Sequence, residues 1–88
     1  MIKFYRNKTK LGDREILKAA KLDDNGNVIE VVGIIGKVKD LKEAKIIFVD
    51  GKADGKKWLA VTIKGGEKVK EAESKKEAAE IIREWFDN

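Results

Sequence analysis

The dipeptide Asn25-Gly26 constrains the fold of this chain more than any other feature, because it predicts a tight reversal between two apolar arms. Asn and Gly tolerate the positive φ angles of a type I′ turn, which joins two antiparallel strands. We therefore expect a β-hairpin with arms at residues 15–23 and 28–39. Gly33 and Gly36 lie in the second arm, where a bulge or a bend would let a long strand coil.

The first arm of this hairpin has a second interpretation. Residues 13–21 contain a candidate helix cap, Asp13, and several residues of high helix propensity. We expect a strand here, with a helix as the alternative. The choice decides the topology of the whole domain.

Two further segments predict strands. Residues 45–49 form a short apolar run, which is typical of a strand buried on both faces. Residues 57–64 alternate in character, which predicts a strand with two different faces. One face is apolar (Leu59, Val61 and Ile63), and the opposite face carries Trp58, Ala60, Thr62 and Lys64.

The last third of the sequence predicts an edge strand followed by a helix. Residues 67–73 follow a Gly-Gly turn, and their alternating charges would discourage edge-to-edge pairing. Residues 74–77 (Ser-Lys-Lys-Glu) form a capping box, in which the Ser hydroxyl and the Glu carboxylate each accept from a free backbone N–H. Apolar residues then recur at helical spacing, so one helix face should pack on the sheet: Ala78, Ile81, Ile82, Trp85 and Phe86.

Together these elements predict a single α+β domain over residues 1–88. We expect a twisted, partly rolled antiparallel sheet of four to six strands with one C-terminal helix packed on it. The chain is 42% hydrophobic and 41% charged, so it holds enough apolar material to fold and is too hydrophobic for a disordered chain. Eighty-eight residues suffice for one core and are too few for two. We expect a monomer.

The residue types argue against catalysis and bound cofactors. The chain has no His and no Cys, and its only serine, Ser74, already serves as the helix cap. Residues 23–27 resemble a calcium loop, but the glycine comes too early and Ile34 stands where a bidentate Glu should be. We therefore expect no enzyme, no metal and no cofactor.

Composition also bears on location and origin. No stretch approaches the roughly 18 consecutive apolar residues of a membrane helix, and residues 1–6 lack a signal-peptide run, so we expect a cytoplasmic protein without membrane contact. Average proline usage predicts about four prolines, whereas the chain has none. The joint absence of Pro, His and Cys, with abundant Lys and Glu, resembles computationally designed proteins, and a thermostable protein of a hyperthermophile is the natural alternative.

Positive charge is concentrated at the N-terminal end. Residues 1–22 carry seven basic and two acidic residues, whereas the rest of the chain carries thirteen and fourteen. Such an excess permits binding of nucleic-acid phosphates. The candidate residues for this interface are the basic side chains and one aromatic ring for base stacking: Lys3, Arg6, Lys8, Lys10, Lys64, Lys75, Lys76 and Trp58.

Residues 58–88 carry a more specific pattern of strand, glycine turn, strand and Ser-Lys-Lys-Glu-Ala-Ala helix. This order resembles the C-terminal half of a double-stranded-RNA-binding domain. The resemblance implies that Lys75 and Lys76 meet phosphates at the helix N-terminus, where the helix dipole also favours anions. Similar endings occur in the DNA-binding domains of some tyrosine integrases and in the plant AP2 domain. The family's His-bearing loop between its first two strands has no counterpart here.

Three hypotheses of function follow. The first is a designed or idealised scaffold without a natural substrate or a certain partner, because caps, turns and composition agree with one another. The second is a small nucleic-acid-binding module that contacts phosphates through Lys and Arg. The third is a protein–protein module that uses an exposed strand edge or the strand face around Trp58.

Overall fold

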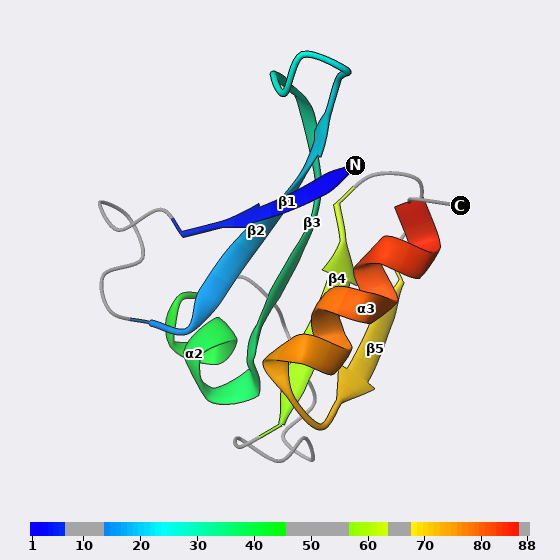
Figure 1. Cartoon of the computed structure of the whole chain (residues 1–88). Helices are drawn as coiled ribbons and strands as arrows, with labels where there is room; N and C mark the ends of the chain where they lie inside the picture. Colours follow the sequence, from blue (N-terminus) through cyan, green and yellow to red (C-terminus); the bar gives the residue numbers. More distant parts are fainter. Residues whose placement is uncertain (7–13, 46–56, 64–67, 87–88) are drawn as a thin grey trace.

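The chain folds into one antiparallel sheet with a helix on each face. The computed structural model describes residues 1–6, 14–45, 57–63 and 68–86. Within these ranges five strands lie side by side in chain order (Figure 1). They are β1 (Ile2–Tyr5), β2 (Ile16–Leu22), β3 (Val28–Lys37), β4 (Trp58–Thr62) and β5 (Val69–Ala72), and the helices are α2 (Val38–Glu43) and α3 (Lys75–Phe86). The open, twisted antiparallel sheet with a C-terminal helix confirms the expected α+β fold.

β2 and β3 form the expected long hairpin, so the helix alternative for residues 13–21 is wrong over its described part. The turn is not type I′. Gly26 has φ 83°, but among the described non-glycine residues only Lys45 has a positive φ, so Asn25 does not adopt the left-handed conformation. The Asp23 carboxylate instead accepts hydrogen bonds from the backbone N–H groups of Asn25 and Asn27, both at 2.9 Å. This geometry fits a three-residue loop with glycine at a bulge.

The predicted bulge in β3 is present, because the register with β2 skips Val32 beside Gly33. β3 ends at Lys37, so the expected continuation of the strand to residue 39 is wrong: residues 38–43 form α2. The α2 residues Val38 and Leu41 are fully buried, and a Cβ on Gly36 would stand 3.0 Å from the Leu41 side chain. Gly36 therefore allows α2 to lie close against the strand.

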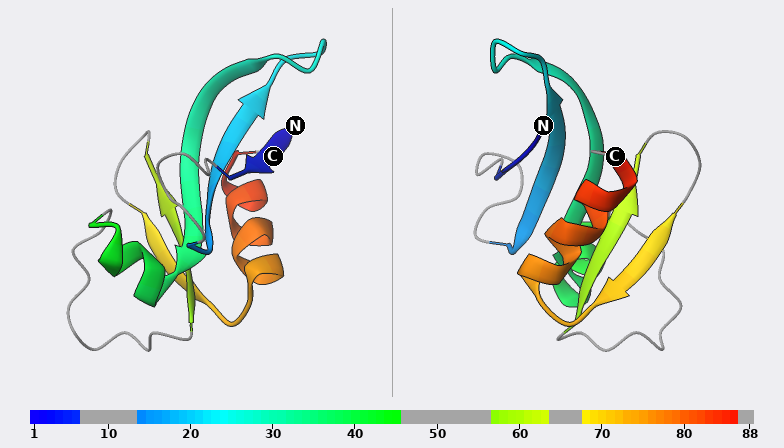
Figure 2. Two further views of the ribbon diagram at one scale, coloured as in Figure 1. Left: turned by 90° about the vertical axis from the view of Figure 1, so that its left-hand side faces the viewer. Right: turned by 45° about the vertical axis from the view of Figure 1, so that its right-hand side comes forward.

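The two helices cover opposite faces of the sheet (Figure 2). We call these the α3 face and the α2 face. The larger core lies on the α3 face and contains Ile2, Leu17, Ala19, Val32, Ile35, Trp58, Ala60, Ala72, Ala78, Ile81 and Ile82, with Phe4, Ala79, Trp85 and Phe86 packed against it. The smaller core lies on the α2 face and contains Ile16, Val38, Leu41 and Leu59. Side chains alternate between these two faces along the regular parts of the strands, and the bulge at Val32 and Gly33 interrupts the alternation in β3.

β4 is apolar on both faces, and α3 covers the face that carries Trp58 and Ala60. Trp58 is only 7% exposed and packs with Ala60 in the core beneath α3. Leu59 lies on the opposite face beneath α2, and Ile63 beyond it is 55% exposed. Trp58 is therefore wrong as a candidate ring for base stacking, because the C-terminal helix covers it.

The remaining elements agree with the sequence. β5 is an edge strand, as expected, and the Ser74 hydroxyl accepts the backbone N–H of Glu77 at 3.2 Å. The Glu77 carboxylate accepts from the N–H of Glu73 at 3.3 Å, one residue before the expected donor. The expected strand at residues 45–49, apart from Lys45, and the Gly-Gly turn lie outside the described residues. Neither helix in the described ranges is long and apolar enough to cross a membrane.

Candidate nucleic-acid interface

The basic residues expected from the sequence do not form one surface. Lys3 and Arg6 are exposed on and beside β1, at one edge of the sheet. Lys75 and Lys76 are exposed in the first turn of α3, which follows β5 at the other edge (Figure 1). The other three basic candidates, Lys8, Lys10 and Lys64, lie outside the described residues. The structure therefore separates two candidate sites.

The first turn of α3 is already capped by its own side chains. Ser74 and Glu77 accept two backbone N–H groups there. The exposed carboxylates of Glu73 and Glu77 stand in sequence on either side of Lys75 and Lys76. A phosphate at this helix end would meet those carboxylates as well as the two lysines. This environment makes the α3 site the less favourable of the two.

The β1 site also includes Tyr5 and Lys18, which are not among the residues expected from the sequence. Ile2 and Phe4 belong to the core on the α3 face, so Lys3 and Tyr5 point to the α2 face. Tyr5 pairs with Lys18 across the β1–β2 ladder, and directly paired residues share a face. We call Lys3, Tyr5, Arg6 and Lys18 the β1–β2 basic patch. Lys3 and Arg6 are exposed, and Tyr5 and Lys18 are half-buried.

The geometry of the ladder places Tyr5 next to two lysines. Lys3 lies two residues away on the same strand, about 7 Å along it. Lys18 lies directly across, with its Cβ about 5 Å from that of Tyr5. A hydrogen bond from Leu22 N–H to the Met1 carbonyl, 2.9 Å long, holds the register of this pairing at its far end. The patch therefore stands on two strands of fixed register.

The electrostatic surroundings distinguish this patch from other lysines of the chain. Neither β1 nor β2 contains an Asp or a Glu, and the β3 partner of Lys18 is Ile34. No carboxylate of the described residues forms an ion pair with Lys3, Arg6 or Lys18. By contrast, the β3 partner of Lys21 is Glu30. The patch thus keeps its positive charge available to a ligand.

Two other lysines are neutralised within the fold. Glu15 lies 2.9 Å from the Lys37 ammonium, and this hydrogen-bonded ion pair raises the pKa of Lys37. Lys57 contacts Glu73 and Glu71, and its hydrogen bond to Glu73 is the main cause of its raised pKa. Both lysines therefore serve local pairs and add little to the binding of an external anion.

A further cation stands on the other face of β1. The Arg83 guanidinium of α3 lies 5.1 Å from the centre of the Phe4 ring, within the range of a cation–π contact. The β1 edge is therefore bordered by positive charge on both faces of the sheet. This distribution agrees with the N-terminal excess of basic residues in the sequence.

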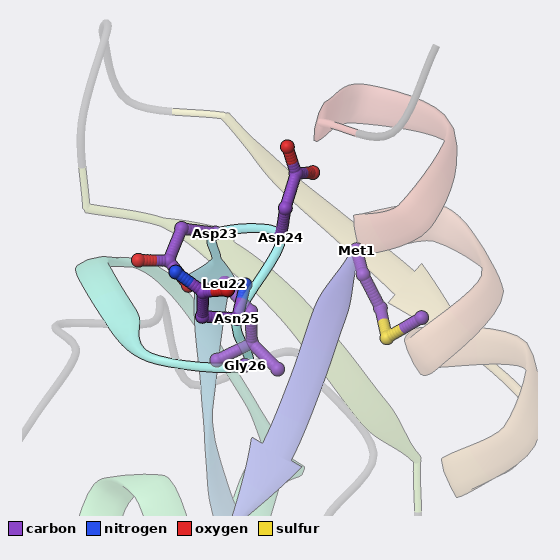
Figure 3. A pocket seen from close by; sticks show the side chains of 6 residues that line it. All are labelled: Met1, Leu22, Asp23, Asp24, Asn25 and Gly26. Carbon is purple, nitrogen blue, oxygen red and sulfur yellow. Dashed lines mark hydrogen bonds between the residues drawn. The ribbon is translucent and has the colours of Figure 1, made fainter.

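A hollow of about 470 Å³ lies beside the hairpin turn, between Met1 and residues 22–26 (Figure 3). The Asp23 carboxylate that borders it is engaged by the N–H groups of its own turn. Met1 is 79% exposed, so the wall of the hollow is open on that side. In the described part of the chain no group of three His, Cys, Asp or Glu residues is placed to hold a metal ion. The hollow lacks the convergent polar groups of a ligand site.

One signal in the sequence could have indicated Tyr5, but none indicates Lys18. The alternation Ile2-Lys3-Phe4-Tyr5 predicts that Lys3 and Tyr5 share a strand face. The pairing with Lys18 depends on the register between β1 and β2, which the sequence alone does not specify.

No family model, curated protein or solved structure matches the chain.

Proposed function

We propose that the chain is a non-enzymatic module that binds the phosphate backbone of nucleic acid through the β1–β2 basic patch. The observation that supports this proposal is the position of Lys3 along β1 and of Lys18 across the ladder from Tyr5, with no carboxylate of the described residues ion-paired to either lysine. Phosphate contacts by Lys and Arg supply most of the affinity of such modules. The module would thus bind with little dependence on base sequence.

The size of the patch sets the expected salt dependence. Contacts from Lys3, Arg6 and Lys18 to three phosphates predict a slope of about −2 in log affinity against log salt for a single strand, and about −2.7 for a duplex. Between about 50 and 200 mM salt the affinity should therefore fall roughly 20-fold to 40-fold. Binding without this dependence would contradict phosphate recognition.

The proposal is tested by fluorescence-anisotropy titration of labelled DNA and RNA at two salt concentrations. Lys18→Glu should weaken binding and reduce the slope by about 0.7 to 0.9, because one phosphate contact is lost. Lys70→Glu is the matched control, since Lys70 is an exposed lysine on the opposite edge strand. Equal effects of the two variants would refute the patch as the binding site.

The same titration tests the site that the double-stranded-RNA-binding resemblance implies. The double variant Lys75→Glu and Lys76→Glu changes only the first turn of α3. If this variant lost binding while Lys18→Glu retained it, the α3 site would be the interface. We expect the reverse, because the Glu73 and Glu77 carboxylates accompany the α3 lysines.

A stable scaffold without a natural ligand is the second proposal. It is supported by the agreement between local signals and fold at two places, the Ser74 cap of α3 and the chain reversal between β2 and β3. A flat titration with every nucleic acid would favour it. The protein–protein hypothesis named two surfaces, an exposed strand edge and the strand face around Trp58. Since α3 covers the Trp58 face, a strand edge is the surface that a protein partner could use.

A further inference from the structure

We propose that the β1–β2 basic patch takes single-stranded nucleic acid, with one base stacked on the Tyr5 ring and the adjoining phosphates bound by Lys3 and Lys18. This inference rests on the proposed function and specifies its ligand. Base stacking on an aromatic side chain beside basic groups is the common means of binding single strands without sequence readout.

Tyr5 is the described aromatic residue that lies outside both cores. The structure describes five aromatic residues, and four of them belong to the core on the α3 face or pack against it: Phe4, Trp58, Trp85 and Phe86. Tyr5 belongs to neither core and is half-buried on the α2 face. Tyr5 is thus the one described ring that lies outside both cores, and it stands beside the lysines of the patch.

Two lysines lie close to Tyr5 in the sheet. Lys3 lies about 7 Å from Tyr5 along β1, and Lys18 lies directly across the ladder. A base on the ring would therefore have a cation along the strand and another beside it. Among the described residues, α2 covers this face over Ile16 and Leu59.

The β2–β3 hairpin is poorly suited to enter the groove of a nucleic-acid duplex. The hairpin of β2 and β3 projects beyond the rest of the sheet (Figures 1 and 2), and a two-stranded ribbon fits a major groove. Its turn, however, carries the exposed residues Asp23 and Asp24. Two carboxylates at the tip would be repelled by the phosphates on either side of a groove. The projecting element is therefore unsuited to duplex DNA.

The test compares labelled oligothymidylate and oligouridylate of about 16 nucleotides, the upper end of single-strand site sizes, with a duplex of the same length. Tighter binding of either single strand is expected. Tyr5→Ala should weaken single-strand binding by roughly 5-fold to 150-fold, the range found for one stacked base, and Tyr5→Phe should retain it. The duplex should bind both variants with equal affinity.

A second measurement uses the unaltered chain, so it does not depend on the folding of a variant. Oligonucleotides that contain bromouracil are photocrosslinked to the protein, and the attached peptide is identified by mass spectrometry. Attachment at Tyr5 is expected. Attachment at Trp85 or at the first turn of α3 would overturn the inference.

The outcomes separate this inference from the function on which it rests. If Lys18→Glu loses salt-dependent binding while Tyr5→Ala binds like the unaltered chain, the patch binds phosphates and the stacking role is refuted. If single strand and duplex bind equally, the preference is also refuted. If no nucleic acid binds at either salt concentration, both proposals fail together.

Discussion

Gly33→Ala should destabilise the fold, because the strands β3 and β4 leave no room for a side chain at this position. A Cβ at Gly33 would stand 2.7 Å from the carbonyl oxygen of Val61 and 3.0 Å from Cδ1 of Ile82. Favourable contacts between non-bonded heavy atoms lie near 3.5 Å or beyond, so the paired backbones would have to separate. Overpacking of this kind costs about 1 to 3 kcal/mol.

Part of this cost is offset in the unfolded state. Replacement of Gly by Ala lowers the entropy of the unfolded chain, which stabilises the protein by about 0.4 to 1 kcal/mol. Because the closest contact, at 2.7 Å, is with a backbone oxygen, the overpacking cost should lie in the upper half of its range, at about 2 to 3 kcal/mol. The net loss at Gly33 should therefore be about 1 to 2.6 kcal/mol. For a domain of this size such a loss lowers the melting temperature by roughly 5 to 20 °C.

Urea denaturation followed by tryptophan fluorescence measures this loss, since Trp58 lies in the core beneath α3. Gly36→Ala is the control. A Cβ at Gly36 would stand 3.0 Å from the Glu15 carbonyl oxygen and from the Leu41 side chain, neither as close as the 2.7 Å contact at Gly33, so a smaller loss is expected. Adding Ile82→Val to Gly33→Ala should not restore stability, because the contact with the Val61 carbonyl remains. A neutral Gly33→Ala, or full rescue by Ile82→Val, would refute the reasoning.

Three further predictions concern other parts of the fold. Leu41→Ala should cost about 2 to 5 kcal/mol in urea denaturation, because its fully buried side chain holds α2 on the sheet; a loss below 1 kcal/mol would contradict that role. Ser74→Ala should cost about 1 kcal/mol, whereas Ser74→Asp, which keeps a cap acceptor, should cost less. Glu15 raises the pKa of Lys37, so this pair stabilises the fold fully below about pH 10 and the contribution is lost as the pH rises through the folded-state pKa. The difference in melting temperature between the unaltered chain and Lys37→Gln should accordingly stay constant up to about pH 10 and narrow at higher pH. A difference that does not change above about pH 10 would show that the titration of Lys37 does not cause it.

The sequence predicts those elements whose signals are local. The hairpin turn, the strand at β4, the charged edge strand β5 and the capped helix α3 each depend on residues close together in the chain. α2 lacks such a signal. Its N-cap residue, Lys37, makes no side-chain cap, and the helix is only six residues long. It is held by the packing of Val38 and Leu41 against the sheet and by a hydrogen bond from Val38 N–H to the Lys57 carbonyl. Such contacts between distant segments are not visible in a local pattern.

The orientation of β4 shows the same limit in a different form. A strand with apolar residues on both faces does not reveal which face the main helix covers. Here α3 lies over Trp58 and Ala60, and α2 lies over Leu59. The polarity of Thr62 favours the opposite choice, yet its hydroxyl accepts the N–H of Lys68 at 2.9 Å and so is satisfied at a buried position. Thr62 therefore does not mark a solvent-exposed face, because its hydroxyl is bonded to Lys68, the residue that precedes β5.

The candidate site was only partly predictable for a related reason. Lys3 and Arg6 follow from the excess of charge near the N-terminus, which composition reveals directly. Tyr5 and Lys18 enter the site only through the register of β1 on β2. β1 is four residues long, and its pairing partner begins eleven residues after β1 ends. A strand this short carries too little pattern to specify its partner.

The position of the β1–β2 basic patch also separates binding from stability. Lys3, Tyr5 and Lys18 belong to neither core, whereas the residues that hold α2 and α3 on the sheet are buried. Exposed substitutions outside such cores usually change stability by less than about 0.5 kcal/mol, so Lys3→Glu should alter binding and leave the unfolding transition nearly unchanged. Phe4→Ala, one residue away, should do the opposite, because Phe4 packs against the core on the α3 face. Urea denaturation and anisotropy titration of these two adjacent variants distinguish a binding surface on β1 from a strand that serves only to close the sheet. If Lys3→Glu changed neither quantity, β1 would have only the structural role.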